Sequence, residues 1–230
     1  MIHLLSVERS YPAPGSHLCG LAWDGHALWH SDAGTDRLYC LDVHTGIILR
    51  EVICPEVRTG LTYDGTSLWH MAGYPKQIRL IDPANGHLVR VIELGKGAEE
   101  RCGLFVDDTS YWAGPGQQGR ITQHALSDNM VLSTCGDVPS AEGIAMIGSL
   151  LWYTSYWQRL LAAVDLRTGQ EMQRYHLPGD PTGLCWDGAR FWYCDYMHRQ
   201  ICAIRPQSLR MQKDTPRISP LFMQREAKEG

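Results

Sequence analysis

Side chains that can transfer protons recur at one position of this sequence, directly after a tryptophan. His30, His70, Tyr153 and Tyr193 occupy four of the five occurrences, and Ala113 occupies the other. Imidazole exchanges protons near neutral pH, and a phenol can donate a hydrogen bond to a developing oxyanion. We therefore predict these four side chains to be catalytic. A structural interpretation stays open, because His and Tyr also serve as hydrogen-bonding groups between packed strands.

Glu142 completes the predicted catalytic set. It directly precedes the glycine Gly143, where a strand is expected to begin. A carboxylate at the mouth of a channel is costly to desolvate unless it has a purpose, although a structural pair with Arg58 or Arg101 is the other interpretation. The predicted substrate-binding residues lie in neighbouring loops and are His17, Arg58, Arg101, Tyr156, Trp157 and Asp195.

An internal repeat of about forty residues spaces these groups. In each of five copies a glycine is followed, nine residues later, by a tryptophan. Asp-Gly lies between the two in the first, second and fifth copies, which is a strong signal for a tight hairpin. The pairs are Gly20 and Trp29, Gly60 and Trp69, Gly103 and Trp112, Gly143 and Trp152, and Gly183 and Trp192.

Two more strands follow each tryptophan. The first copy has a β-type run at 37–42, a Thr45-Gly46 turn and a second run at 47–53. Four antiparallel strands per forty-residue repeat are typical of a propeller blade. The predicted fold is therefore all-β, a five-bladed β-propeller that forms a single domain over residues 1–205.

The two ends of the repeat array are expected to complete each other. The fifth copy ends after its third strand, at 201–205, whereas an unassigned strand at 3–11 begins the chain. We predict that this N-terminal strand is the outer strand of the last blade, which closes the ring and removes an open sheet edge. Residues 206–230 are predicted to form a tail that packs on the propeller or on a neighbouring subunit, giving a homo-oligomer.

Propeller topology sorts the loops into two faces. Loops that lead into each first strand share one face with the loops that join second and third strands, around the central channel. The predicted catalytic and substrate-binding residues all belong to this face. The other face is formed mostly by Asp-Gly and Thr-Gly turns, including the turn that holds Asn85.

Charge and composition exclude several partners. The net charge of −4 comes with no long basic run, so nucleic acid is not expected. The sequence shows neither a basic leader with an apolar core nor a membrane-spanning stretch, so we expect no membrane partner and a cytoplasmic location.

The eight cysteines are then expected to be reduced, with Cys194 the most reactive. No Cys-x-x-Cys occurs, and we predict neither a metal nor another cofactor.

The motif Gly-Leu-x-Trp-Asp-Gly-x-x-Leu-Trp, followed by Ile/Leu-x-x-Ile/Leu-Asp-x-x-Thr-Gly, resembles the propeller superfamily of glutamine cyclotransferases, virginiamycin B lyases and gluconolactonase-like enzymes. Within this superfamily, the number of five blades matches the glutamine cyclotransferases best, and these enzymes form pyroglutamate without a metal. The lyases use His and Glu near the axis, and His17 and Glu142 lie in comparable loops. The gluconolactonase-like metal site needs an Asn that this face lacks, since Asn85 and Asn129 lie at turns of the other face.

These observations predict an enzyme that acts on a small polar or anionic molecule at the channel mouth. General acid–base chemistry of the lyase or cyclising-transferase kind fits the residue types. The alternative is a non-catalytic propeller that binds a sugar or a partner protein through exposed aromatic rings. Those rings would be Tyr153, Tyr156, Trp157, Tyr193 and Tyr196.

Overall fold

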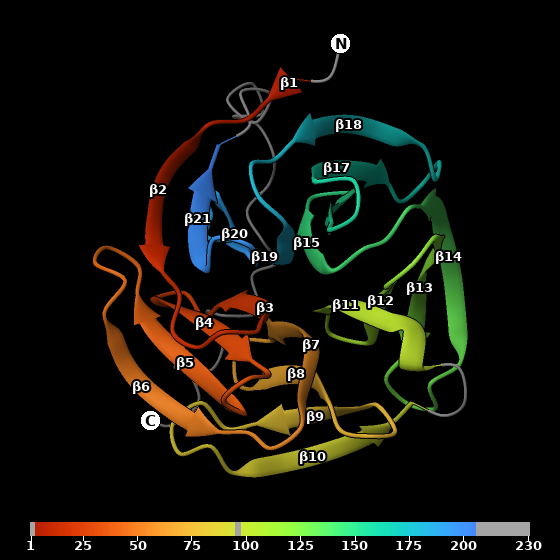
Figure 1. The fold of residues 1–230 in the computed structure, drawn as a ribbon. Coiled ribbons are helices and arrows are strands. Elements are labelled where there is room, and N and C mark those ends of the chain that lie inside the picture. The colour runs from red at the N-terminus through yellow and green to blue at the C-terminus, as the bar shows by residue number, and fades with distance from the viewer. Residues whose placement is uncertain (1–2, 95–97, 206–230) are drawn as a thin grey trace, which may run out of the picture.

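The computed structural model describes residues 3–94 and 98–205, so the predicted tail at 206–230 lies outside the described residues. Five sheets stand around a central axis, as the ribbon in Figure 1 shows, and the predicted five-bladed β-propeller is confirmed. Within the described part of the chain, no helix has the length and apolar character that crossing a membrane requires.

Each blade is a four-stranded antiparallel unit in which the first strand is innermost. Blade I contains β3 (Leu18–Trp23), β4 (Ala27–Asp32), β5 (Arg37–Asp42) and β6 (Ile48–Ile53), and blade II contains β7 (Val57–Tyr63), β8 (Leu68–Ala72), β9 (Gln77–Ile81) and β10 (Leu88–Glu93). Blade III contains β11 (Arg101–Val106), β12 (Ser110–Pro115), β13 (Gly119–Ala125) and β14 (Val131–Val138), after the short helix η1 (Ala98–Glu100). Blade IV contains β15 (Gly143–Ile147), β16 (Leu150–Ser155), β17 (Leu160–Asp165) and β18 (Glu171–His176). Blade V contains β19 (Pro181–Trp186), β20 (Phe191–Asp195), β21 (Gln200–Ile204) and, from the start of the chain, β2 (Val7–Pro12).

The Asp-Gly turns form as predicted between the first and second strands. Gly25, Gly65 and Gly188 have φ angles of +98°, +99° and +94°. This left-handed region is open to glycine because it has no Cβ atom. The turn glycines therefore fix the hairpins that present the repeat tryptophans to the core.

The repeat glycines allow the five inner strands to approach one another closely. A Cβ atom on Gly20 would lie 2.5 Å from the backbone nitrogen of Leu61, and one on Gly183 would lie 2.5 Å from that of Leu21. Such distances are shorter than real Cβ contacts, so a larger residue would force neighbouring blades apart. The narrow ring of inner strands frames the channel.

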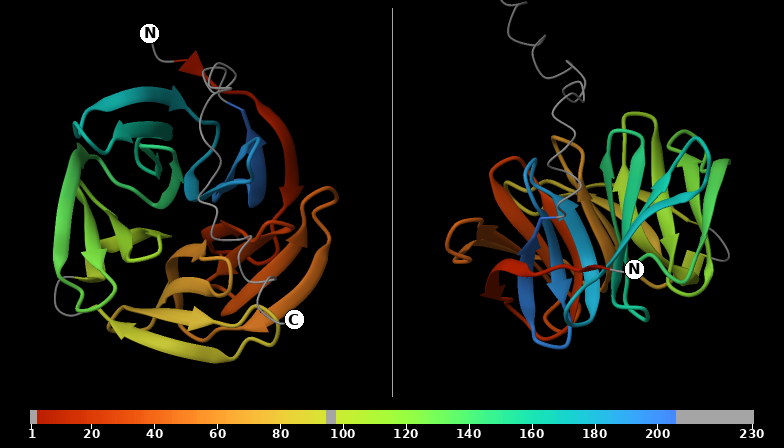
Figure 2. Two further views of the ribbon diagram at one scale, coloured as in Figure 1. Left: turned by 180° about the vertical axis from the view of Figure 1, so that it is seen from behind. Right: turned by 90° about the horizontal axis from the view of Figure 1, so that it is seen from above.

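The N-terminal segment joins two blades. β1 (His3–Leu4) pairs in parallel with β18 of blade IV, and β2 pairs antiparallel with β21 of blade V. The continuous strand expected at 3–11 is therefore wrong, because the chain leaves one sheet before it enters the next. Leu5, at this crossing, is buried in the hydrophobic cluster that also contains Trp152 and Ile204. Figure 2 shows this crossing at the rim of the ring.

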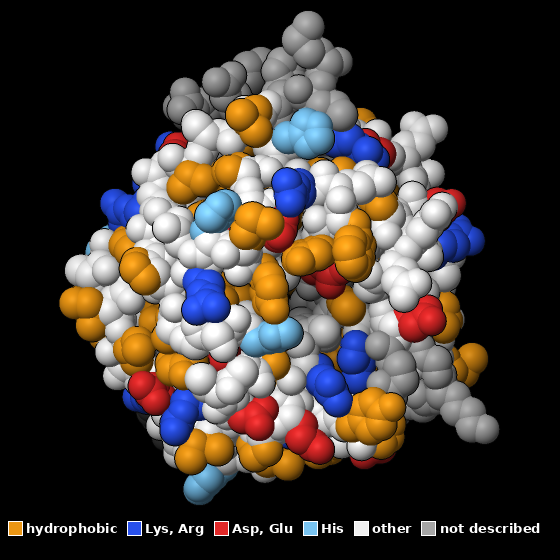
Figure 3. Space-filling model, viewed as in Figure 1, with side chains coloured by type: hydrophobic (Ala, Val, Ile, Leu, Met, Phe, Trp, Pro, Cys, Tyr) orange, Lys and Arg blue, Asp and Glu red, His pale blue; other side chains and the backbone are white. Residues whose placement is uncertain are grey.

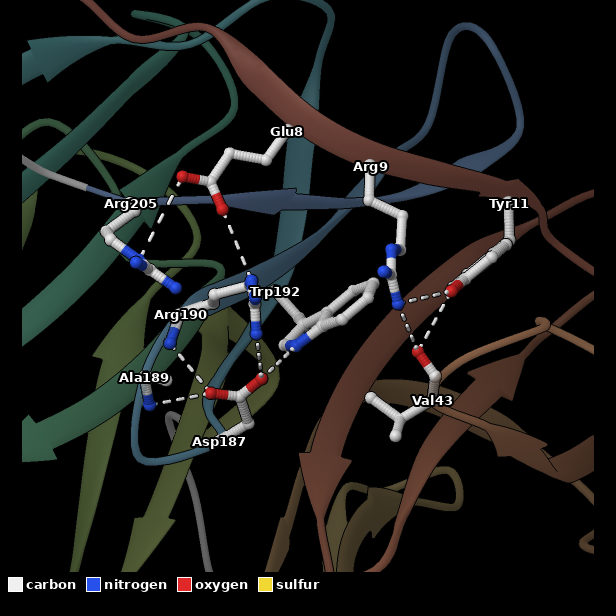
Figure 4. Close-up of polar contacts among 9 residues, drawn as sticks. All are labelled: Glu8, Arg9, Tyr11, Val43, Asp187, Ala189, Arg190, Trp192 and Arg205. Atoms are coloured by element: carbon white, nitrogen blue, oxygen red, sulfur yellow. Dashed lines mark hydrogen bonds and ion pairs between the residues drawn. The ribbon is translucent and has the colours of Figure 1, made fainter.

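Side-chain contacts hold β2 on both sides, as Figure 4 shows. Toward blade V, the Glu8 carboxylate lies 3.2 Å from Arg190 Nε and 3.9 Å from Arg205 Nε. Toward blade I, the Tyr11 hydroxyl donates to the carbonyl oxygen of Val43 at 2.9 Å. β2 thus connects the last blade to the first.

Candidate functional site at the channel mouth

A cavity of about 290 Å³ opens where the loops leading into the inner strands converge. Figure 3 looks onto this face and shows hydrophobic side chains gathered around its centre beside histidine, basic and acidic groups. All five blades contribute to the lining. The lining residues are His17, Leu18 and Cys19 of blade I, Arg58 and Thr59 of blade II, Gly116 of blade III, Glu142, Tyr156 and Trp157 of blade IV, and Thr182 and Tyr196 of blade V.

Five of the predicted site residues meet in this cavity: His17, Arg58, Glu142, Tyr156 and Trp157. They come from residues 17 to 157 of the sequence, and the ring arrangement of the blades brings them together. Whether each has its predicted role in binding or catalysis stays a prediction.

The floor of the cavity is built from the residues that directly precede the repeat glycines. The equivalent positions hold Cys19, Thr59, Cys102, Glu142 and Thr182. Four of these line the cavity, and a Cβ atom on the lining residue Gly116 would lie only 2.7 Å from Cys102 Sγ. Sequence reasoning did not predict Thr59 and Thr182 as site residues. The repeat register could have identified them, because they share their position with Glu142.

Glu142 is the one carboxyl group among these five floor positions, and its pKa is shifted. Burial raises its pKa from 4.5 to about 7, against the opposing effects of hydrogen bonds to Cys102 and Ser140 and of the positive charge of Lys76. At neutral pH the carboxyl group therefore exists in both protonation states. Lys76 is buried and donates a hydrogen bond to the carbonyl oxygen of Arg101, which fixes this charge below the mouth.

Aromatic rings from three consecutive blades form one wall. Tyr156 makes edge-to-face contacts with Trp157 at a centroid distance of 5.1 Å and with Tyr196 at 6.1 Å. Tyr196 makes a further edge-to-face contact with His17 at 5.1 Å, and its hydroxyl lies 3.0 Å from His17 Nδ1. We call Trp157, Tyr156, Tyr196 and His17 the aromatic arc. Trp157 is 72 % exposed, so this end of the arc is open to solvent.

Arg58 extends from blade II, which contributes no ring to the arc. Its Nε atom donates to the carbonyl oxygen of Gly73 at 3.3 Å, and its guanidinium carbon lies 5.2 Å from the centre of the Tyr74 ring. Both contacts hold the exposed guanidinium group beside the cavity. A positively charged group of this shape can bind a carboxylate through two parallel hydrogen bonds.

The four side chains after the repeat tryptophans do not line this cavity. His30, His70, Tyr153 and Tyr193 are each exposed by 1 % or less. We expected them in loops, but the strands β4, β8, β16 and β20 continue past the tryptophan, so these residues pair within the sheets. Their expected position at the channel mouth is therefore wrong. Burial lowers the pKa of His30 and of His70 to about 4, so both imidazoles are neutral at pH 7.

Three of these four buried side chains form hydrogen bonds with backbone carbonyl groups. His30 Nε2 lies 3.2 Å from the Pro14 carbonyl oxygen, and His70 Nδ1 lies 3.1 Å from the Gly60 carbonyl oxygen. The Tyr193 hydroxyl donates to the carbonyl oxygen of Pro178 at 3.0 Å. These contacts favour the structural interpretation, in which the side chains hold the loops that shape the mouth.

Arg101 and Asp195, which were predicted to bind substrate, do not line the cavity either. Arg101 Nη1 donates to the Tyr111 hydroxyl at 3.2 Å, between strands of blade III. Asp195 is 4 % exposed, and its carboxylate accepts from the Asp180 backbone nitrogen at 3.1 Å and lies 2.7 Å from His198 Nδ1. Neither residue lines the cavity, and Asp195 instead fixes the loop that leads into β19.

Cys194 does not lie at a loop mouth, as the sequence suggested. It is fully buried in β20, and burial raises the pKa of its thiol well above 9.0. Its predicted high reactivity is not supported by this position, since a reactive thiol needs access and thiolate character. Among residues 3–94 and 98–205, no three His, Cys, Asp or Glu side chains gather closely enough to hold a metal ion.

The ring of four-stranded blades and the cavity on its axis define a five-bladed β-propeller with a site at the channel mouth. No protein-family model and no curated protein sequence matches this chain. Among solved structures, it is similar to glutaminyl cyclase from Myxococcus xanthus with a TM-score of 0.74, at 13 % identity over 88 % of this chain and 96 % of that one. This likeness establishes the fold and bears out the resemblance at that level.

Two other solved structures are similar at lower scores. A catalytically inactive virginiamycin B lyase from Staphylococcus aureus, crystallised with quinupristin, gives a TM-score of 0.50 at 17 % identity, over 85 % of this chain and 68 % of that one. A chain of a nidogen/laminin complex gives 0.57 at 12 % identity, over 83 % and 81 %. At these identities the shared property is the fold.

Proposed function

We propose that this protein is an enzyme that acts on a small polar or anionic molecule at the channel mouth. Its reaction is a general acid–base reaction of the lyase or cyclising-transferase kind. The observation that carries the proposal is the Glu142 carboxyl group, which lines a cavity and has a pKa near 7. A general acid or base is most effective when its pKa is near the working pH.

In this proposal Glu142 moves the proton. As a carboxylate it removes a proton from a substrate carbon or nitrogen held in the cavity, and as the acid it returns one to the leaving or newly formed group. Cys102 and Ser140 are its hydrogen-bonding neighbours, which orient the carboxyl group in the floor. The buried charge of Lys76 stabilises the ionised form.

The surrounding groups position the substrate. Arg58 binds a carboxylate on the side of blade II, and the Tyr196 ring, whose hydroxyl lies 3.0 Å from His17 Nδ1, forms part of the aromatic wall that contacts the substrate. His30 and His70 support this mouth from below through their contacts with loop and strand backbone. The fold shared with glutaminyl cyclase and virginiamycin B lyase supports an enzyme of this type.

The test is a screen of small polar compounds for binding and turnover, followed by variants. Glu142→Gln, which keeps size and removes the ionisation, should reduce the turnover of the identified substrate about a hundredfold to ten-thousandfold. Asn85→Ala on the other face is the control and should leave turnover unchanged. Full turnover by Glu142→Gln would overturn the role of Glu142, and loss of turnover in Asn85→Ala would place the site on the other face.

His70→Gln separates the catalytic interpretation of the buried layer from the structural one. It should lower the melting temperature and leave the pH dependence of turnover unchanged, because His70 is buried and does not line the cavity. A loss of turnover as large as that of Glu142→Gln, without a change in stability, would restore the catalytic prediction for this position.

A second candidate is a non-catalytic binding propeller. It is favoured by Trp157, which is 72 % exposed and also lines an open groove of about 600 Å³ between blades III and IV. Exposed aromatic rings of this kind are frequent centres of protein interfaces. Stable binding of a ligand with no chemical change, and with equal affinity for Glu142→Gln, would favour this candidate.

A further inference from the structure

The aromatic arc presents a continuous π surface to the cavity. Trp157, Tyr156 and Tyr196 each line the cavity, and neighbouring rings are nearly perpendicular, with interplanar angles of 84° and 77°. The faces of aromatic rings carry partial negative charge, and a cation positioned against them is attracted. Perpendicular rings offer a bound group several such surfaces at once.

A carboxyl group lies in the floor below these rings. Glu142 lines the same cavity, and its ionised form is destabilised by burial, so a positive charge placed beside it would compensate for the lost hydration. Aromatic rings combined with a nearby carboxylate are suited to a methylated ammonium group. The Tyr196 hydroxyl is already engaged with His17, so this wall presents mainly π surface to the ligand.

Blade II, which lies outside the arc, contributes a positively charged group that favours an anion. Arg58 lines the cavity, and its contacts with Gly73 and Tyr74 hold its guanidinium group in place. A guanidinium group binds a carboxylate with matched geometry. The cavity therefore has one side for a cation and another for an anion, and its volume of about 290 Å³ suits a small ligand.

We propose that the channel mouth binds a small zwitterion, with a methylated ammonium group against Tyr156, Trp157 and Tyr196 and a carboxylate at Arg58. This inference rests on the proposed function, because it names the chemical class of the substrate for the same cavity. Glu142 then faces the ammonium end of the ligand, next to the atoms whose protons are most acidic.

The test measures binding of three probes to the full chain by calorimetry and by saturation-transfer NMR. Glycine betaine has both charges, 3,3-dimethylbutanoate is its carbon isostere without the positive charge, and choline lacks the carboxylate. We expect betaine to bind roughly tenfold more tightly than 3,3-dimethylbutanoate, a factor between those of an exposed and a desolvated cation–π contact. Equal affinity of the two isosteres would overturn the cation site.

Variants locate the two ends of the ligand. Tyr196→Leu should weaken betaine and choline alike, whereas Arg58→Gln should weaken betaine and leave choline unchanged. Arg120→Gln, at an exposed arginine that does not line the cavity, is the matched control and should change neither. Equal binding of betaine by Arg58→Gln and the native chain would overturn the carboxylate site.

Failure of this inference can be told apart from failure of the proposed function. If neither betaine nor choline binds while another small polar compound binds at the cavity, the zwitterion assignment is wrong and the proposed function stands. If no small polar compound binds there at all, both are wrong. A compound that binds Tyr196→Leu more weakly than it binds the native chain is bound at the cavity.

Discussion

Asp24 and Trp29 are joined by a hydrogen bond from the indole Nε1 to the carboxylate Oδ2, at 2.7 Å. The same pair recurs in blade II, as Asp64 and Trp69 at 2.6 Å, and in blade V, as Asp187 and Trp192 at 2.7 Å. The other oxygen of each aspartate accepts from backbone nitrogens of the hairpin turn. One carboxylate thus fixes both the turn and the tryptophan that packs beyond it.

Replacing this carboxylate should destabilise the blade. Asp24→Ala leaves the buried indole nitrogen of Trp29 without its acceptor and removes two turn hydrogen bonds, so the free energy of unfolding should fall by about 2 kcal/mol. Denaturant unfolding measures the change. Asp108→Ala, at an exposed position of the equivalent turn in blade III, is the control and should cost less than about 0.5 kcal/mol. Equal effects of the two variants would show that the indole hydrogen bond contributes nothing.

The raised pKa of Glu142 gives a pH-dependent loss of stability. The folded chain retains this proton to about pH 7, whereas the unfolded chain loses it near 4.5. Between these values the folded state binds more protons, so this group lowers the free energy of unfolding as pH rises, by up to about 3 kcal/mol in total.

Glu142→Gln should remove that dependence. The difference in unfolding free energy between Glu142→Gln and the native chain should grow in favour of the variant from pH 4.5 to pH 7 and stay constant above it. Because His30 and His70 act in the opposite direction in both proteins, the difference isolates Glu142. Urea unfolding across this range measures it, and a constant difference at every pH would contradict the raised pKa.

Cys102 should react first with a thiol reagent. It is partly exposed, and the other seven cysteines of the described chain are buried. Its labelling should still be slow at pH 8, because burial and the nearby Glu142 carboxylate raise its pKa to about 12. Peptide mapping by mass spectrometry after treatment with N-ethylmaleimide measures the order of labelling. Faster labelling of Cys194 than of Cys102 would contradict the burial described above.

Deletion of residues 1–12 should abolish the cooperative unfolding of the propeller. It removes β2, which leaves β21 as an open sheet edge and breaks the Glu8 and Tyr11 contacts. Deletion of residues 1–4 is the control, because it removes only the two-residue pairing with β18 and should lower the melting temperature by a few degrees. A cooperative transition at an unchanged temperature in the longer deletion would show that β2 is dispensable.

The fold could be predicted from the sequence because its signals repeat. Five glycine–tryptophan pairs in register each indicate the same four-stranded unit, and Asp-Gly turns indicate the same hairpin in three copies. The division of the N-terminal strand could not be predicted in this way. β1 pairs with a strand more than 160 residues away, and its partner is chosen by the burial of Leu5 rather than by a local pattern.

The candidate site was predicted only in part. His17, Arg58, Glu142, Tyr156 and Trp157 lie where loops must converge in any propeller, so topology alone places them. His30 and Tyr193 were assigned to the mouth because the strand ends were placed at the tryptophan. In the structure β4 and β20 extend up to three residues past their tryptophans, so these side chains are buried within the sheets. The sequence has no turn residue at the tryptophan or directly after it that would locate the end of the strand.

The pairing of β2 with β21 also has a consequence for the order in which the protein folds. Residues 7–12 bond to residues 200–204, so this contact closes a loop of nearly the whole described chain, and its entropic cost rises with that length. Blades I to IV each contain strands that are contiguous in sequence and can form from local contacts. During synthesis β2 therefore waits without its partner β21 until residue 204 has left the ribosome, and closure of blade V follows the formation of the other four blades.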